Sequence, residues 1–374
     1  MTKIEVISSC TLVGTANESH PVAKSRLELT PWDLLFLQID PIQKGLLFHK
    51  PNESQEFQKN IIDHLINSFS RTLGFFPPLA AAWAPLRTTA ITRRVSSSTA
   101  TMPELSSLTL LLAPCLFPTS WKQSCSANHV VVDGACFWHF FNSWSEISCG
   151  FDKISKSPVF ERRFDNGAIR FPTLEQNHLQ NSVPSPLLRR VFHFCKESVA
   201  KLKAKANSKL ANIRNNLSSQ EACIYLLVDA RARISLPEGY FGNAVYVAST
   251  ETSETKVLQN GLGYAGIKIN ELVAQQTSEA AIKYVEDWVK NPTILRKGGI
   301  AFVISSSPRH NIYGNDFGWG KPIAVRCGKV QKFDGNMMVH PAAVSGGIDV
   351  EVCLAPETLK AMEGDVEFME AVTI

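Results

Sequence analysis

The segment NHVVVDG at residues 128–134 carries the side chains best suited to acid–base chemistry. An imidazole has an unperturbed pKa of roughly 6.5, so a neutral His129 can take a proton from an alcohol or an amine near pH 7. The residue stands in an apolar run, residues 124–132, that predicts a buried strand, and Gly134 permits a sharp turn before the amphipathic residues 137–144. The pattern therefore predicts a base at a strand-turn-helix corner.

The same spacing has a structural interpretation. His129 can be a hydrogen-bonded histidine of the core and Asp133 a helix cap, because a histidine four residues before an aspartate occurs often by chance. Cys125 and Cys136 lie nearby, but neither has a visible partner that would activate a thiolate, so we interpret both as structural. The motif alone leaves catalysis and packing open.

A second segment, DFGWG at residues 316–320, accompanies the first. Further phrases are LTPWDLL at 29–35, FPPLA at 76–80, YFGNA at 240–244 and KP at 321–322. With these motifs the chain resembles the plant BAHD acyltransferases, whose two signatures are HxxxDG and DFGWG. The resemblance covers residues 1–80 and 125–374. Within the family, the sequence is most similar in general pattern to the hydroxycinnamoyl-CoA transferase-like and uncharacterised acetyltransferase members.

The resemblance implies an α/β, two-domain chloramphenicol acetyltransferase-like fold with mixed sheets, flanking helices and an active site at the domain interface. It also implies transfer of an acyl group from acyl-CoA, a co-substrate and not a bound cofactor, to a hydroxyl or amine of a plant specialised metabolite. His129 would deprotonate the acceptor, which attacks the thioester directly without an acyl-enzyme. The same scaffold can also carry lyase chemistry, although a well-placed base favours transfer. An aromatic acyl donor is favoured by general likeness alone.

Roles for other residues follow from the family. Trp319 would donate its indole N–H to the developing oxyanion, or else serve as a packing anchor. Asp133 would turn away from the imidazole and pair with Arg231 or Arg233, a structural role. The residues expected to shape the site are Gly134, Asp316, Gly318 and Gly320. The residues expected to contact CoA are Ser198, Lys201, Lys203, Ser305 and Ser306, although periodicity alone favours a solvated lysine face near 201–209.

Two departures from the family pattern stand out. After FPPLA, residues 81–120 contain no Gly, Asp or Asn, so the turn residues expected between strands are missing. Residues 97–105 can be encoded by bases that give a family-like strand in another frame, so we hypothesise that this stretch is translated out of frame. Near residues 220–222 a helix of the family is missing. The alternative function is therefore an inactive or poorly folded product of a damaged gene model, or a module that binds CoA or the acceptor.

Composition agrees with a globular enzyme, since the 374 residues are 44% hydrophobic and 19% charged with a net charge of +4. Nothing predicts nucleic-acid or membrane partners. The chain has no apolar run long enough to span a membrane and no secretory signal at its start, so we expect a cytoplasmic protein, and the resemblance implies a monomer. The nine scattered cysteines lack zinc-like spacing, which indicates reduced thiols and no metal.

Periodicity predicts an alternation of helices and strands that is typical of α/β proteins. Proline and glycine in residues 151–187 predict a long connection. The expected organisation is an N-terminal domain at 1–155 with the first motif, a crossover at 156–190, and a C-terminal domain at 191–374 with the second. The predicted helices cover 52–71, 196–210, 257–275 and 279–289. The predicted strands cover 3–11, 124–132, 223–228, 244–248, 300–305, 323–327, 337–339 and 348–354.

Overall fold

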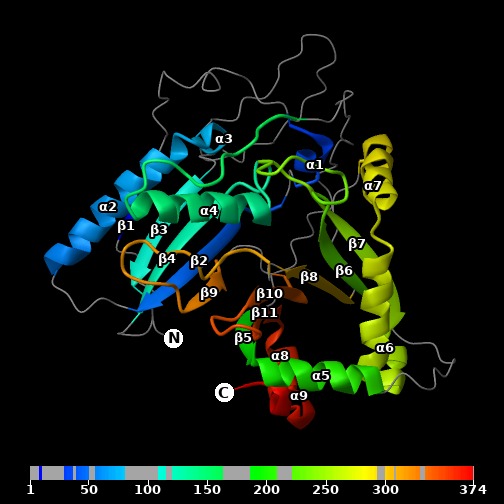
Figure 1. Cartoon of the computed structure of the whole chain (residues 1–374). Coiled ribbons are helices and arrows are strands. Elements are labelled where there is room, and N and C mark those ends of the chain that lie inside the picture. Colours follow the sequence, from blue (N-terminus) through cyan, green and yellow to red (C-terminus); the bar gives the residue numbers. More distant parts are fainter. Residues whose placement is uncertain are drawn as a thin grey trace. The chain divides into compact units, whose positions relative to one another are not determined.

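In the computed structural model the chain forms two compact units (Figure 1). The first comprises Met1–Asn181, Glu238–Asn243 and Gly314–Ile323, and the second comprises Ser182–Pro237, Ala244–Tyr313 and Ala324–Ile374. The DFGWG segment at 316–320 belongs to the first unit, and the predicted domain limits stay a prediction. The structure describes residues 8–10, 29–36, 39–49, 55–80, 108–114, 120–162, 186–208, 221–292, 300–306, 309–328 and 333–373.

In the first unit, four antiparallel strands lie in the order β1-β3-β4-β2. Their bounds are β1 Ser8–Cys10, β2 Ile42–His49, β3 Leu108–Pro114 and β4 Ser120–Ala127. Along β4 burial alternates, with Gln123, Cys125 and Ala127 buried and the intervening serines half-buried, because successive side chains point to opposite faces. This face of the strand therefore packs in the core.

The predicted strand at 124–132 is wrong at its carboxyl end, since β4 stops at Ala127. The Asn128 side chain accepts a hydrogen bond from the Val130 N–H at 3.0 Å, and the Asn128 carbonyl accepts one from Val131 at 3.2 Å. An asparagine that bonds its own backbone two residues on favours a turn over a continued ladder. His129 consequently lies in a turn and not in a strand.

The helices of the first unit are α1 Pro31–Leu34, α2 Gln55–Leu73, α3 Pro77–Ala80 and α4 Gly134–Ser148. On α2, Ile61, Leu65, Phe69 and Leu73 repeat every four residues and are buried, as the predicted helix at 52–71 required. Phe69 meets Phe140 and Trp144 of α4 edge-on, at 5.4 and 5.0 Å between ring centroids. The two helices lie side by side (Figure 1), and their aromatic rings pack together.

The second unit has a mixed sheet in the order β5-β11-β10-β8-β6-β7. Strand β8 runs parallel to β10 and to β6, and the remaining pairs are antiparallel. This confirms the predicted mixed α/β sheet. The strands of this unit are β5 Leu188–Phe194, β6 Glu221–Asp229, β7 Val245–Ser253, β8 Ile300–Ser306, β9 Ala324–Cys327, β10 Asn336–Pro341 and β11 Ile348–Leu354, and β9 is not a strand of this sheet. The helices are α5 Lys196–Ser208, α6 Glu254–Ala274, α7 Ser278–Lys290, α8 Pro356–Gly364 and α9 Val366–Ala371.

One face of this second sheet is apolar. Phe192, Phe194, Val352 and Leu354 project from β5 and β11 and pack with Leu359 of α8, and half-buried residues of α5 and α9 cover them. The opposite face of the same strands carries ionisable side chains, because residues alternate along each strand. The two faces therefore differ sharply in polarity.

The unusual stretch at 81–120 is described only in part. Leu108–Pro114 forms β3, which pairs with β1 and β4, whereas 81–107 and 115–119 lie outside the described residues. Near residues 220–222, where we expect a family helix to be missing, residue 220 lies outside the described residues and Glu221 begins β6. The translation of this stretch out of frame stays a hypothesis.

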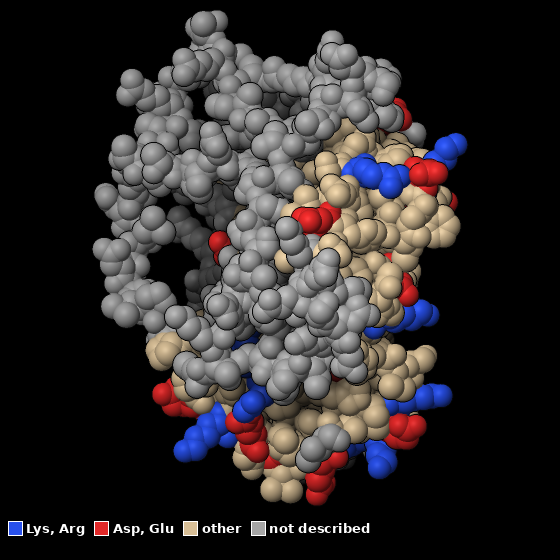
Figure 2. Space-filling model, turned by 90° about the vertical axis from the view of Figure 1, so that its left-hand side faces the viewer, with Lys and Arg blue, Asp and Glu red and all other residues tan. Residues whose placement is uncertain are grey.

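The described surface mixes both signs of charge (Figure 2). Ion pairs such as Lys283–Asp287 at 2.8 Å and Arg71–Asp152 at 3.1 Å join opposite charges on it. Within the described ranges, none of the helices has the length and apolar character needed to cross a bilayer. The cysteines at 125, 136, 149, 195, 223, 327 and 353 are free thiols.

Candidate active site around His129

His129 lies in the turn between β4 and α4, and its side chain is 7% exposed. Its imidazole stacks on the ring of Phe36, with centroids 4.3 Å apart and planes within 1° of parallel. Phe36 follows helix α1 and comes directly after the segment LTPWDLL, and its ring is the surface on which the imidazole stacks. This stacking fixes the plane of the ring without consuming its nitrogen atoms.

Burial lowers the pKa of His129 below its usual 6.5. The nearby Asp133 carboxylate and Asn243 raise the pKa in opposition, and the Lys44 ammonium adds to the lowering. The net shift is downward, so the ring is neutral at pH 7. A neutral imidazole has a nitrogen lone pair that can accept a proton, which is the state that a general base needs.

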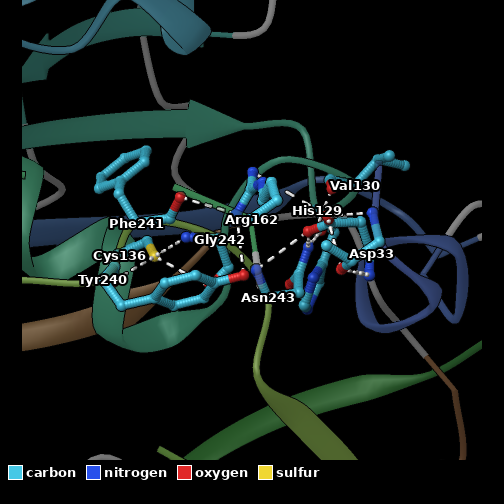
Figure 3. Close-up of polar contacts among 10 residues, drawn as sticks. Asp33, His129, Val130, Cys136, Arg162, Tyr240, Phe241, Gly242 and Asn243 are labelled. Atoms are coloured by element: carbon cyan, nitrogen blue, oxygen red, sulfur yellow. Dashed lines mark hydrogen bonds and ion pairs between the residues drawn. The ribbon is translucent and has the colours of Figure 1, made fainter. Parts of the chain in front are cut away.

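The Asn243 amide holds the backbone of this turn. Its Nδ2 group lies 2.9 Å from the carbonyl oxygen of His129, 2.9 Å from that of Val130 and 3.1 Å from Oδ1 of Asp33 (Figure 3). The backbone N–H of Asn243 also donates to Asp33 Oδ1, at 3.0 Å. Asn243 is fully buried, so these bonds form without competition from water. The residue therefore links the turn that carries His129 to helix α1.

Asp33 is the centre of this network and is 0% exposed. Its Oδ2 accepts hydrogen bonds from the Thr30 backbone N–H at 2.8 Å and from the Thr30 hydroxyl at 2.9 Å. These bonds belong to a capping box in which Thr30 also caps α1. A buried carboxylate needs several donors, and Thr30 and Asn243 provide them.

Arg162 supplies the positive charge beside Asp33. Its Nη2 lies 3.9 Å from Asp33 Oδ2, and its Nη1 donates to the Tyr240 hydroxyl at 3.1 Å and to the Phe241 carbonyl at 2.9 Å. Burial lowers the pKa of Arg162, but Asp33 and Tyr240 raise it by more, so the guanidinium stays charged. A Cβ at Gly242 would lie 1.4 Å from Nη1, so the arginine fits only beside a glycine. The YFGN residues, 240–243, thus form the site in which the Arg162 side chain packs.

Asp133 is the N-cap of α4. Its Oδ1 accepts a hydrogen bond from the Cys136 N–H at 3.0 Å, and Gly134 is the first residue of the helix. A carboxylate here also complements the positive end of the helix dipole. Arg231 and Arg233 belong to the second unit, where they bond Asp229 and the Gln276 carbonyl. Their predicted pairing with Asp133 stays a prediction.

The DFGWG segment is a tight turn anchored to α4. Asp316 Oδ1 accepts hydrogen bonds from the N–H groups of Gly318 at 2.9 Å and Gly320 at 3.0 Å. Both glycines have positive φ, at 104° and 100°, a conformation that side-chain-bearing residues rarely adopt. The Ser145 hydroxyl of α4 bonds the Asp316 backbone, donating to its carbonyl at 2.6 Å and accepting from its N–H at 2.7 Å. These contacts give the acid and the glycines a turn-forming role.

The two aromatic residues of this turn face different surroundings. Phe317 is 0% exposed and packs edge-on against Trp144 at 4.8 Å and Phe141 at 5.8 Å. Trp319 is half-buried, with its ring 6.2 Å from that of Phe48 and 5.9 Å from that of Phe317. Trp319 is thus held by rings, whereas His129 is held by Phe36 and Asn243. Its role as an oxyanion donor stays a prediction.

The residues expected to contact CoA lie in the second unit. Ser198 is in the first turn of α5, 3.5 Å from the Thr373 hydroxyl, and Lys201 and Lys203 are exposed on the same helix. On β8, the Ser305 hydroxyl donates to the Met337 carbonyl at 3.3 Å, and Ser306 ends the strand. The two lysines are therefore accessible cations, while Ser305 is already engaged within the sheet.

Sequence reasoning assigned no role to Asp33, Arg162 or Asn243, which the structure places around the His129 turn. Asp33 and Asn243 stand inside the phrases LTPWDLL and YFGNA, so the available signal was that both phrases belong to the family pattern. Arg162 lay in a stretch interpreted as loop and carried no signal. Asp33 is separated from Asn243 by 210 positions and from Arg162 by 129 positions, so only the fold brings the three residues together.

Comparison with known proteins agrees with this geometry. The Transferase family model matches residues 121–219 and 209–369. An uncharacterised acetyltransferase of Arabidopsis thaliana is 29% identical over 424 residues, covering 93% of this chain and 95% of the relative.

Two solved structures share the fold. Vinorine synthase has a TM-score of 0.68 at 17% identity, covering 99% of this chain and 98% of that one. TRI101 of F. sporotrichioides, solved with coenzyme A and T-2, has a TM-score of 0.67 at 14% identity, covering 93% and 99%. The fold is thus the predicted two-domain chloramphenicol acetyltransferase-like fold. The chain belongs to the Transferase family, the plant BAHD acyl-CoA-dependent acyltransferases.

Proposed function

We propose that this enzyme moves an acyl group from acyl-CoA to a hydroxyl or an amine of a plant specialised metabolite, with His129 as general base. His129 takes the acceptor proton while the acceptor oxygen or nitrogen forms a bond to the thioester carbonyl carbon. The carbon–sulfur bond then breaks, and the CoA thiolate leaves with the proton that His129 returns. No acyl-enzyme forms.

The observation that carries this proposal is the buried, neutral imidazole in a turn whose backbone is fixed. Burial keeps the pKa of His129 below 6.5, so the base is deprotonated at neutral pH. Stacking on Phe36 fixes the plane of the imidazole, and the Asn243 amide fixes the backbone carbonyl of His129 by a hydrogen bond. A base held in one orientation adds to the rate because reacting groups need not be ordered at each turnover.

Asp133 supports the base indirectly in this proposal. As the N-cap of α4 it ends the turn that carries His129, and pairing with Arg231 or Arg233 would fix it from its other side. Its Oδ1 is occupied by the Cys136 N–H. Asp133 is accordingly a positioning residue, and proton transfer rests on His129 alone. Trp319 is the proposed oxyanion donor.

Acyl-CoA is the proposed donor, since the family is acyl-CoA-dependent and TRI101, which shares the fold, is solved with coenzyme A. Ser198, Lys201, Lys203, Ser305 and Ser306 are the proposed contacts. The exposed lysine ammonium groups suit the phosphates of CoA. The likeness to hydroxycinnamoyl transferases favours an aromatic acyl group. Cytoplasmic location and a monomeric state stay predictions.

The test is release of CoA thiol by the purified full-length chain. Acetyl-, malonyl-, benzoyl- and coumaroyl-CoA are each offered with a mixture of plant alcohols and amines. His129→Ala should lower acceptor-dependent release by roughly 10²–10⁴-fold, the usual contribution of a positioned base. The matched control is His49→Ala, which removes an exposed histidine at the end of β2 and should leave release unchanged. Undiminished release in the His129 variant refutes the proposed base.

A second candidate is a module that binds CoA or the acceptor without transferring acyl groups. Its support is that the alignment with the Arabidopsis relative is 424 residues long, longer than the 374 residues of this chain, so the relative has segments that are missing here. Calorimetric binding of CoA by a chain that releases no thiol with any donor and acceptor favours this module. Acceptor-dependent release excludes it.

A further inference from the structure

Strand β9 brings a cysteine close to a histidine and a glutamate on the polar face of the second sheet. His340 of β10 is opposite Asp349 of β11, so the two side chains share a face, and Glu351 shares that face because it lies two residues from Asp349. The Cys327 N–H at the end of β9 donates to Glu351 Oε2 at 2.9 Å. This bond brings the thiol of β9 over the β10–β11 pair.

Three potential metal ligands meet at this point. Cys327 Sγ lies 3.7 Å from His340 Nε2, and the ligand atoms of Cys327, His340 and Glu351 all lie within 4.8 Å of one another. In a tetrahedral zinc site, Zn–S of about 2.3 Å and Zn–N of about 2.0 Å place sulfur and nitrogen roughly 3.6 Å apart. The spacing of the cysteine and histidine therefore already matches that of a shared zinc ion.

Burial favours ligation of an ion over mere proximity. His340 is 1% exposed, Glu351 is 6% exposed and Cys327 is half-buried, so the strands hold the three side chains in place. Thiolate, imidazole and carboxylate form the mixed donor set that zinc accepts, with water as a fourth ligand on the partly open cysteine side. Softer donors of this kind disfavour calcium and magnesium.

The surroundings supply an outer shell. Glu351 Oε1 accepts from Arg189 Nη1 at 3.2 Å, and Oε2 accepts from the Cys327 N–H, which leaves further lone pairs on the carboxylate. Arg326 lies 3.6 Å from Asp349 Oδ2, and His193 Nδ1 lies 2.7 Å from Asp349 Oδ1. Arg189 is thus paired with Glu351 and Arg326 with Asp349. The thiolate of Cys327 would offset half the charge of a divalent ion. Hydrogen bonds of this kind orient ligating carboxylates in metal sites.

We propose that Cys327, His340 and Glu351 form a zinc-binding site that ties the end of β9 to the β10–β11 pair. The site is separate from His129, which lies in the first unit, and takes no part in acyl transfer. Binding of Zn²⁺ displaces the thiol proton of Cys327, so zinc is taken up with release of a proton. The sequence alone gave no sign of it, because the ligands are spaced 13 and 11 residues apart and lack a Cys-x-x-Cys pair.

The experiment uses the full chain, stripped with a chelator and then titrated with Zn²⁺ or Co²⁺. We expect about one bound ion per chain, a rise in Tm on adding zinc, and thiolate-to-cobalt absorption in the near ultraviolet. Cys327→Ser should abolish this absorption and the stoichiometric zinc. The matched control is Cys149→Ser, which removes an exposed thiol of the first unit and should retain both signals.

Two results overturn the proposal. One is a wild-type chain that takes up no stoichiometric zinc and whose Tm is the same in chelator and in zinc. The other is thiolate-to-cobalt absorption that persists in the Cys327 variant, because another cysteine then holds the metal. The chelator measurement on the wild-type chain decides the question even when a variant folds poorly.

Discussion

Replacement of Asn243 by leucine is the most direct test of how the His129 turn is held. Leucine has the same number and branching of side-chain heavy atoms as asparagine but cannot donate, so the shape of the side chain is roughly kept while the amide bonds disappear. The change removes donors from Asp33 Oδ1 and from the carbonyls of His129 and Val130. The backbone N–H of residue 243 still reaches Asp33, at 3.0 Å, so the carboxylate keeps part of its shell.

The expected cost follows from the two N–H bonds that one amide can donate. One bond to the buried carboxylate contributes about 2 kcal/mol and one to a backbone carbonyl about 1 kcal/mol, for a total near 3 kcal/mol. The first unit, which holds Asn243, falls in the range of 150–250 residues, for which Tm changes by roughly 2–4 °C per kcal/mol, so its Tm should fall by about 6–12 °C. Catalysis should fall too, because the carbonyl beside the base is no longer fixed.

The assay combines thermal unfolding with steady-state kinetics on the same preparation. Below the lowered Tm, we expect a reduced kcat with little change in KM for acyl-CoA. The control is Asn260→Leu, which removes one amide bond, to the Lys256 carbonyl at 2.8 Å within α6, and should shift Tm by far less. An unchanged Tm refutes the proposed bonds. A lower Tm with an unchanged kcat refutes the positioning role and leaves Asn243 purely structural.

Further expectations concern the base, the two motif turns and the packing of Arg162. Because burial lowers the pKa of His129, kcat/KM should stay constant as the pH falls to 6.5 and should decline only below that pH. The stability that depends on the neutral ring should be lost as the pH falls through the lowered pKa. An inflection above pH 6.5 in a pH–rate profile contradicts this expectation. Asp316→Ala removes two charge-assisted bonds and should cost about 3 kcal/mol in urea unfolding, whereas an unchanged midpoint denies their contribution. Gly242→Ala should displace the Arg162 guanidinium from its contacts with residues 240–242 and lower Tm. An unaltered Tm means that the arginine side chain can move aside without loss of stability. Asp133→Asn keeps a capping side chain but loses the charge. Loss of the dipole interaction alone costs about 1 kcal/mol, so a loss of about 3–5 kcal/mol supports the predicted arginine pair and a loss of about 1 kcal/mol or less rules it out.

The regular elements were largely predictable because their periodicity is local. The four-residue repeat of α2 and the apolar strands of the second sheet are visible in the sequence, and the structure has them within a few residues. The strand before His129 was overextended because Val130 to Val132 look like strand residues. The side chain of Asn128 overrides that preference by closing a turn on the Val130 N–H.

Sequence alone determined which residues could do chemistry and which family they belong to. The HxxxDG and DFGWG segments are short and local, so their letters suffice to nominate His129 as a base and Asp316 as a turn former. What only the tertiary structure decided is how far His129 is buried, and hence the direction of its pKa shift. It also decided the contacts among Asp33, Arg162 and Asn243, because residues separated by 129 and 210 positions meet only when strands and loops are packed. Strand register sets which side chains of β10 and β11 share a face, and the fold brings the Cys327 N–H to Glu351 from 24 positions away, which sequence spacing does not reveal.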